Sequence, residues 1–270
     1  MNDIGTYGDE FFKHLQPGSY SSAQQIVPFV MELLSPQRVV DLGCGAGAWL
    51  SVFLEHGADY VIGVDGEYVN RDLLAIPKAS FFAHDLTEPF RTSEKFDLAI
   101  SLEVGEHLPA SSAQPYVDSL VNLAPIVLFS AAIPGQSGVA HINEQWPQYW
   151  ADRFSRRGYI VVDALRPRFW NDPRIQPWYR QNALFFVDNR ETAILKQLEA
   201  SSGNVAGVCP SLVHPWLYQR YRDAPKDELR PLRYYLSHIP AAVGRSVRWR
   251  FIERRMTPIK SAVPEDEKRS

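Results

Sequence analysis

Short apolar runs alternate with stretches of helical periodicity from Arg38 to about Asp188. Such alternation is typical of βα units that build a parallel sheet. Six runs are expected to be parallel strands: residues 38–43, 60–65, 80–85, 96–103, 125–133 and 159–165. A seventh run, residues 182–188, follows the sixth without a convincing crossover helix, so we expect it to pair antiparallel as a hairpin partner. The pattern predicts an α/β protein with a seven-stranded sheet, its last strand reversed and helices on both faces.

The two ends of the chain differ from this middle part. Residues 1–37 are expected to form an N-terminal cap, with an entry helix predicted after Tyr20 by apolar positions at helical spacing and by serines able to cap it. Residues 38–190 form the core. Residues 191–270 are expected to be a small helical extension with a basic segment, 244–256, and a flexible polar tail. The basic segment suits peripheral contact with an anionic membrane or a glycosyltransferase, or a solvated helix that packs its tryptophan inward.

Composition narrows the class of protein. The formal net charge of −3 gives no global basic field, so binding of duplex nucleic acid as the main task is disfavoured. Cys44 and Cys209 are the two cysteines, and their separation fits neither a zinc site nor a disulfide scaffold, which favours a reducing compartment. No apolar run has the length of a bilayer span, and no secretion signal is evident at the start of the chain, so we expect a cytoplasmic protein. The oligomeric state is left open.

A glycine-rich turn, VVDLGCGAG at residues 39–47, follows the first predicted strand. This turn also satisfies the dinucleotide-binding fingerprint, so it is compatible with a nicotinamide or flavin enzyme as well. Asp41 favours another ligand, because it would repel a diphosphate but suits the cationic amino group of a methionine moiety. Asp65 ends the second strand, where it suits ribose hydroxyls, and Asp85 ends the third, where it can accept from an adenine amino group. The three aspartates together favour S-adenosylmethionine (SAM) over a dinucleotide.

Acidic and imidazole side chains follow the next two predicted strands. Glu103 closes the fourth strand, and Glu106 and His107 follow it at spacings that gather them on one side of a helical turn. His141 follows the fifth strand, which is expected to lie beside the fourth. Two carboxylates and two imidazoles can hold a divalent cation, with Mg²⁺ or Mn²⁺ favoured by the oxygens. A metal-free general base at His141, or a purely structural histidine, fits the same pattern.

Taken together, these motifs resemble those of class I SAM-dependent methyltransferases, and within them a bacterial group associated with polysaccharide biosynthesis. The resemblance covers about residues 20–188 and rests on VVDLGCGAGAWL, VIGVDGEYV, FFAHDLTEP, FDLAISLEVGEHLP and GVAHINEQWPQYWADRF, which contain the EVxEH and HxNE motifs. It implies a Rossmann-like fold with its last strand reversed. It places around the cofactor Tyr20, Ser22, Asp41, Gly43, Cys44, Gly45, Asp65, Gly66, Asp85, Leu86, Leu102 and Glu103.

The Glu-x-x-Glu-His run with a later histidine also resembles the metal site of small-RNA 3′-end 2′-O-methyltransferases, which position a vicinal diol on the ion. Related quinone-pathway methyltransferases carry a similar Glu-x-x-x-His run without requiring that chemistry. On this resemblance the metal ligands would be Glu103, Glu106, His107 and His141, with the last three as the catalytic candidates.

Aromatic and arginine side chains crowd the segment after His141. They are Trp146, Tyr149, Trp150, Phe169, Trp170, Trp178 and Tyr179, with Arg166, Arg168, Arg174 and Arg180. The aromatic rings can pack in the core or stack on a sugar, and the arginines can bind an anionic acceptor or face solvent. We expect an O-methyltransferase that acts on a sugar hydroxyl of a glycan or glycan precursor. Carboxyl or small-metabolite methylation, and a non-catalytic SAM-binding partner of a glycosyltransferase, are the alternatives.

Overall fold

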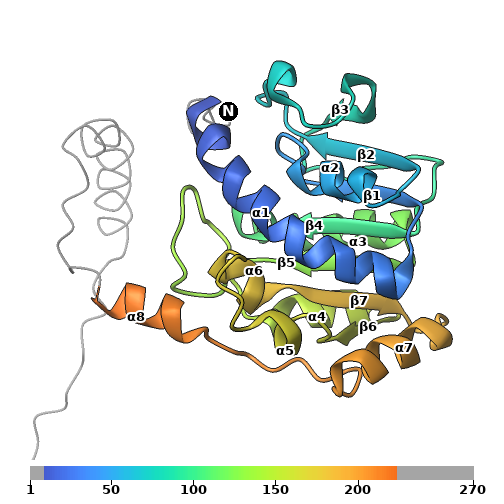
Figure 1. Ribbon diagram of the computed structural model, residues 1–270, viewed down its shortest axis with the longest axis vertical. Coiled ribbons are helices and arrows are strands. Elements are labelled where there is room, and N and C mark those ends of the chain that lie inside the picture. Colours follow the sequence, from blue (N-terminus) through green and yellow to red (C-terminus); the bar gives the residue numbers. More distant parts are fainter. Residues whose placement is uncertain (1–8, 224–270) are drawn as a thin grey trace, which may run out of the picture. The chain divides into compact units, whose positions relative to one another are not determined.

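The computed structural model describes residues 9–223, with side chains described for residues 17–219. The basic segment and the polar tail expected near the end of the chain lie outside these residues. Within them, a seven-stranded sheet with the order β3-β2-β1-β4-β5-β7-β6 forms the centre of the fold (Figure 1). The strands are β1 (Arg38–Leu42), β2 (Tyr60–Asp65), β3 (Phe81–Ala83), β4 (Leu98–Leu102), β5 (Ile126–Ser130), β6 (Tyr159–Val162) and β7 (Leu184–Asp188).

Strand pairing confirms the predicted fold class. β1 pairs parallel with β2 and β4, and the same direction continues to β3 and β5. β7 runs antiparallel to both of its neighbours, with Val187 opposite Ile126 on one side and Ile160 on the other. The lack of a convincing crossover helix between β6 and β7 predicts their antiparallel pairing, and residues 163–183 join the two strands. The same feature does not predict the insertion of β7 between β5 and β6, because sequence distance carries no information on which sheet edge a hairpin joins.

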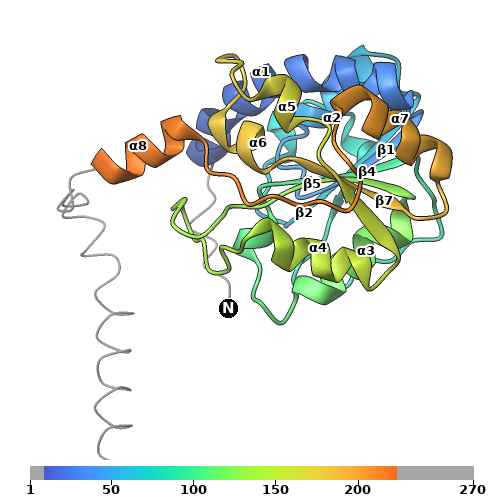
Figure 2. The same cartoon turned by 90° about the horizontal axis from the view of Figure 1, so that it is seen from below.

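Helices cover both faces of the sheet (Figure 2). They are α1 (Asp9–Leu34), α2 (Ala48–Glu55), α3 (Ala113–Leu123), α4 (Pro147–Ser155), α5 (Arg166–Phe169), α6 (Pro177–Asn182), α7 (Thr192–Ser202) and α8 (Pro215–Asp223), with 3₁₀ turns η1 (Arg71–Leu73), η2 (Lys78–Ser80) and η3 (Gly105–His107). Figure 2 shows α1, α2 and α7 on one side of the sheet and α3 and α4 on the other.

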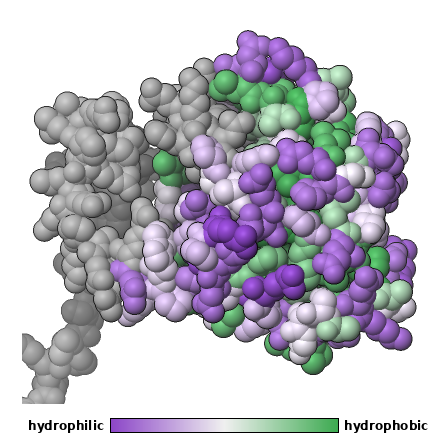
Figure 3. Space-filling model, viewed as in Figure 1, coloured by the Kyte–Doolittle hydropathy of each residue, from purple (hydrophilic) through white to green (hydrophobic). Residues whose placement is uncertain are grey.

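Two hydrophobic cores follow from the alternation of side chains along the strands. Along β7, Phe185 and Val187 belong to the core under α1, α2 and α7, whereas Leu184 and Phe186 belong to the core over α3 and α4. The face in Figure 3 shows hydrophobic residues exposed between hydrophilic ones. Within the described part of the chain, no helix has the length and apolar character needed to cross a membrane.

The first part of the expected C-terminal extension packs on the core. Leu198 of α7 is fully buried, and α7 contacts α1 and β6. Further along, the Asn204 side chain donates to the Asp163 carbonyl at 2.9 Å, and the His214 amide donates to the Gln181 side chain at 2.7 Å. The compact unit that holds the sheet therefore continues to Arg222.

Candidate active site

A cavity of about 1050 Å³ lies at the carboxyl ends of β1, β2 and β4. It unites most of the residues that the sequence singled out. They are Asp41, Gly43, Cys44, Gly45, Asp65, Gly66, Asp85, Leu86, Leu102, Glu103, Glu106, His107 and His141. Both the expected cofactor residues and the expected catalytic residues therefore face one space, as strand ends in a parallel sheet require.

The glycine turn between β1 and α2 is shaped for a ligand. Gly43 has φ +95°, and a Cβ atom placed on it would lie 2.2 Å from Val104 Cγ2. Gly47 also has positive φ and precedes the first turn of α2, whose free N–H groups face this end of the helix. A residue other than glycine at position 43 would strain the backbone and clash with the Val104 side chain. The turn thus fits the close approach of a bound cofactor.

Two buried aspartates lie side by side at this turn. Burial and the neighbouring Asp65 raise the pKa of Asp41 well above its usual range. Asp65 accepts hydrogen bonds from the Gly45 and Gly66 amides, both at 2.7 Å, and from the Tyr68 hydroxyl at 2.5 Å. Its pKa is also raised by burial, although these hydrogen bonds act in the opposite direction. A cationic ligand group would stabilise the charged form of such a pair.

Asp85 lies two residues beyond the end of β3 and is exposed on the cavity wall. Its Oδ1 accepts from the Thr87 amide at 3.0 Å and from the Thr87 hydroxyl at 2.8 Å. The carboxylate therefore caps the turn after the strand and also lines the cavity, next to Leu86. Turn capping and cofactor binding do not exclude each other at this residue, because the geometry allows both.

The Glu103 carboxylate is held by amide side chains. Its carboxylate accepts from Asn182 Nδ2 at 3.0 Å and from Gln136 Nε2 at 2.8 Å. Burial raises its pKa, and these hydrogen bonds lower it in part. The backbone at Glu103 is left-handed, with φ +58°, a strained conformation that is concentrated at functional sites.

Glu106, His107 and His141 form the tightest group of potential metal ligands in the described part of the chain. One ligand atom from each lies within 4.8 Å of the others, and Glu103 is outside this group. Glu106 is fully buried, and neither of its carboxylate oxygens has a hydrogen-bond partner among the described residues. Burial and the charge of Glu103 raise the pKa of Glu106 well above its usual range. Burial and His141 lower the pKa of His107 to about 4, so its imidazole is neutral near pH 7.

An uncompensated buried carboxylate beside neutral imidazole nitrogen is a fitting place for a cation, because burial of such a group without a partner is costly.

The loop after β5 brings His141 to this group. The amides of Ile142 and Asn143 both donate to the Glu106 carbonyl, at 2.9 and 3.0 Å. The Glu144 carboxylate organises the rest of the loop, since it accepts from the Gly135 amide at 2.8 Å and the Ser137 amide at 2.7 Å. It also contacts His141 Nδ1 at 2.9 Å, while His141 Nε2 lies 4.0 Å from Glu106 Oε1. These contacts give the HxNE motif a physical explanation.

Two of the expected cofactor residues do not reach the cavity. Tyr20 donates to the Glu55 carboxylate at 3.0 and 3.2 Å, and buried Ser22 donates to the Gly18 carbonyl at 2.7 Å. Ser19 lines the cavity in their place, within 3.1 Å of the Tyr179 hydroxyl. The reason is that α1 is already helical at this point, so residues one and three positions after Ser19 face other directions.

The arginines after β6 do not line the cavity. Arg174 forms a bidentate pair with Asp172, and Arg168 lies 4.5 Å above the ring of Phe29. Arg166 is buried against Asp163, and Arg180 donates to a backbone carbonyl. The structure thus gives no support to an arginine cluster that binds an acceptor carboxylate or phosphate.

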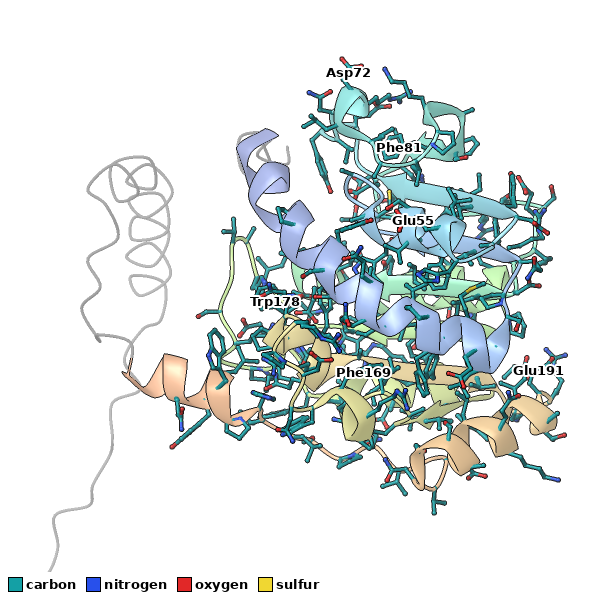
Figure 4. All side chains as sticks on the ribbon, in the orientation of Figure 1. Glu55, Asp72, Phe81, Phe169, Trp178 and Glu191 are labelled. Atoms are coloured by element: carbon teal, nitrogen blue, oxygen red, sulfur yellow. The ribbon has the colours of Figure 1, made fainter. Side chains whose placement is uncertain are left out.

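Several cavity residues are not among the candidate site residues expected from the sequence. Tyr68 and Gln136 come from loops, and Trp216 and Leu217 come from α8. Figure 4 labels Trp178 on α6, which lines the same cavity. The nearness of Tyr68 to Asp65 in sequence is the one available signal, whereas the contribution of α8 depends on a path of the chain that no local pattern shows.

A family model described as a methyltransferase domain matches residues 11–171. The chain belongs to this family. It is accordingly a SAM-dependent methyltransferase by family, in agreement with the glycine turn and its aspartates. No curated protein matches the chain.

The solved structures that this chain is similar to are distant from it in sequence. A candidate O-methyltransferase of Nostoc punctiforme PCC 73102 is 16% identical over 66% of this chain, with a TM-score of 0.49, and the match spans 59% of its own length. The methyltransferase domain of the bacterial protein CtHen1-C is 21% identical over 63% of this chain and 98% of its own, with a TM-score of 0.46. The magnesium protoporphyrin IX methyltransferase of Synechocystis PCC 6803, solved with bound SAM, is 20% identical over 69% of this chain and 84% of its own, with a TM-score of 0.45.

Proposed function

We propose that this methyltransferase acts on a sugar hydroxyl of a glycan or glycan precursor in bacterial polysaccharide biosynthesis, with a divalent cation such as Mg²⁺ or Mn²⁺ at Glu106, His107 and His141. The observation that carries the proposal is the buried Glu106 carboxylate, which has no hydrogen-bond partner among the described residues and lies in the same cavity as the cofactor turn. In the reaction, the acceptor oxygen attacks the methyl carbon of SAM as the carbon–sulfur bond breaks. The products are a methyl ether, S-adenosylhomocysteine and a proton.

The cofactor end of the cavity is assigned from its charges. Asp41 would pair with the amino group of the methionine moiety, and Asp65 would bind the ribose hydroxyls. Because Tyr68 donates to Asp65 in this structure, ribose binding would share or replace that hydrogen bond. Asp85 and Leu86 would border the adenine. The main contribution of the protein at this end is to fix the methyl group in line with the acceptor.

The acceptor end is assigned from Glu106 and the two histidines. A divalent cation, when bound, would lower the pKa of an acceptor hydroxyl and could hold two neighbouring hydroxyls of a sugar. His107 is suited to such binding because its imidazole stays neutral down to about pH 4. Glu144 fixes the ring of His141 through Nδ1 and leaves Nε2 on the side of Glu106. Such carboxylate–histidine contacts orient metal-binding imidazoles.

Two other functions, and one other mechanism for the same function, are less well supported. Carboxyl methylation would favour an arginine or lysine side chain that binds the acceptor carboxylate, yet none of the described residues that line the cavity is an arginine or a lysine. His141 as a metal-free general base would use the same Nε2 atom, and it predicts full activity in excess chelator. A non-catalytic SAM-binding role, with the basic C-terminal segment as the contact to a glycosyltransferase, predicts cofactor binding with no turnover.

Direct binding of Mn²⁺ to the purified protein tests the proposal. Titration calorimetry or electron paramagnetic resonance should show binding that is lost in Glu106→Ala and His141→Ala but kept in His56→Ala, a control in an exposed histidine. S-adenosylhomocysteine affinity should be the same in all of them. Methyl transfer to a panel of glycosides should stop with chelator and return with Mn²⁺. Equal Mn²⁺ binding by all variants, or full transfer in excess chelator, would overturn the metal assignment.

A further inference from the structure

The charge and polarity of the cavity differ between its floor and its mouth. The lining carries six carboxylates and three imidazoles, from buried Asp41, Asp65 and Glu106 to exposed Glu67 and Asp85; the others are Glu103, His84, His107 and His141. None of the described residues that line the cavity is an arginine or a lysine. A nucleoside diphosphate or other phosphorylated acceptor would meet repulsion from these carboxylates without a guanidinium or ammonium group to bind it. One divalent cation at Glu106 would offset only part of this negative charge, so the lining still favours an acceptor that is neutral.

The mouth carries large apolar side chains that are exposed. Val139 and Ile142, on the loop after β5, are 51% and 65% exposed, and Trp216 of α8 is 44% exposed. All three line the cavity, together with Leu217 and Trp178. Figure 1 shows the loop between β5 and α4 extending away from the sheet. Apolar residues gathered on the rim of one cavity are typical of a ligand-binding surface, whereas single exposed apolar residues are common on any protein.

The apolar loop is built into the reacting centre. The amide of Ile142 donates a hydrogen bond to the carbonyl of Glu106. His141, which precedes Ile142 in the chain, belongs to the proposed cation site. Ala140 and Ser137 on the same loop have positive φ, with values of +56° and +60°, so the loop holds a strained shape that the Glu144 hydrogen bonds stabilise. The exposed Ile142 side chain therefore belongs to the same cavity as the Glu106 carboxylate and is fixed to it through the backbone.

We infer that the acceptor is a neutral sugar joined to an apolar aglycone, with the sugar at the floor of the cavity and the aglycone between the loop after β5 and α8. This inference rests on the proposed function and adds the class of substrate. Ile142 and Trp216 act as specificity residues, since they contact the aglycone rather than the reacting hydroxyl. The aglycone is an alkyl chain, as in a lipid-linked glycan, or an aromatic ring, and both share the need for an apolar wall.

The test compares acceptors that differ in the group attached to one sugar. Octyl glucoside below its micelle concentration, 4-nitrophenyl glucoside, free glucose and UDP-glucose are offered with SAM, followed by the same set built on other hexoses. We expect kcat/KM for one of the two glycosides to exceed that of the free sugar and the nucleotide sugar by about tenfold or more, since one apolar group is worth at least this much in a fitted pocket. The preferred glycoside distinguishes the alkyl from the aromatic source.

Variants separate the two walls from the reacting centre. Ile142→Ser and Trp216→Ala should each lower the ratio of kcat/KM for the preferred glycoside to kcat/KM for the free sugar by about tenfold. Trp146→Ala is the matched control, because Trp146 is 43% exposed but does not line the cavity. Ile142 lies outside α8, so an effect of Ile142→Ser cannot come from a loss of α8 structure, as an effect of Trp216→Ala could. Equal kcat/KM for all sugar forms, or preference for UDP-glucose, would overturn the inference.

Failure of the proposed function gives a different result. If no sugar is methylated, binding of octyl and 4-nitrophenyl glycosides to the protein loaded with S-adenosylhomocysteine is measured by calorimetry. Binding that is lost in Ile142→Ser and kept in Trp146→Ala supports the apolar acceptor wall even though the reaction is of another kind. Absence of binding in the unmodified protein counts against the wall itself.

Discussion

Removal of the charge at Glu106 should stabilise the metal-free protein while it abolishes activity. Glu106 is fully buried, and neither carboxylate oxygen has a partner among the described residues. A buried polar group left without a partner costs about 1–3 kcal/mol, and more when it is charged. Glu106→Gln keeps the shape and removes the charge, and Glu106→Met also removes the need for hydrogen bonds. In chelator, both variants should gain about 1–3 kcal/mol of unfolding free energy.

Thermal denaturation by circular dichroism measures this gain. For a domain of this size, about 1 kcal/mol corresponds to about 2–4 °C in Tm, so a rise of about 2–12 °C is expected. The rise should depend on pH. Because burial raises the pKa of Glu106 in the folded state, the wild-type protein loses stability as pH increases above the unfolded-state pKa, and the variants do not. The difference should therefore be small near pH 4 and grow toward pH 8.

A divalent cation should reverse the order of stability. Mn²⁺ at about 100 times its dissociation constant stabilises a binding protein by about 2.7 kcal/mol, and it should do so for the wild type alone. Glu88→Gln is the control, because Glu88 is exposed and outside the cavity, and its Tm should change little under any condition. A lower Tm of Glu106→Gln in chelator, or an equal rise of Tm with Mn²⁺ in wild type and variant, would show that the Glu106 carboxylate is not a cation ligand.

Three further predictions concern the cofactor turn and the loop after β5. Gly43→Ala should lose S-adenosylhomocysteine affinity in calorimetry because its Cβ would meet Val104, whereas Gly57→Ala, with φ +98° and open space around it, should cost stability but keep affinity. Glu144→Gln should weaken Mn²⁺ binding by about 10–100-fold and leave S-adenosylhomocysteine affinity unchanged, and an unchanged Mn²⁺ affinity would deny it a positioning role. S-adenosylhomocysteine should bind more tightly as pH rises from 5 to 8, because the raised pKa of Asp41 must be overcome for it to pair with the amino group. Asp41→Asn should remove this dependence, and a dependence that survives the substitution would place the titrating group elsewhere.

The core of the fold is predictable from sequence because each strand carries its own local pattern. β1, β2, β4 and β5 are short apolar runs buried on both faces, a pattern typical of central parallel strands. Their order then determines that residues after the strands meet at one edge. That is why the amino-acid sequence alone suffices to assign Asp41, Asp65, Glu106 and His141 to a common site.

Residues outside the strands are harder to place, for reasons that differ. The prediction that Tyr20 and Ser22 contact the cofactor assumes that the helix begins after them, but α1 is already helical there and presents Ser19 instead. The spacing of Glu103 predicts that it joins the metal ligands. Its backbone is left-handed and its carboxylate accepts from Gln136, and it is not among the ligand atoms that lie close together; no spacing rule reports a backbone conformation.

Hydrogen bonds link the site residues that no sequence pattern reveals to Glu103, which the sequence does single out. Asn182 and Gln136 bind the Glu103 carboxylate, and Gln181 donates to both of these amides, at 2.9 and 3.3 Å. Gln181 in turn accepts from the backbone amide of His214, which directly precedes α8. A buried network of this kind resists rearrangement, since every broken bond would leave an unpaired polar group. The wall that carries Trp216 is thus fixed to the carboxylate at the end of β4, so a change of acceptor specificity at α8 is expected to alter the position of the reacting centre as well.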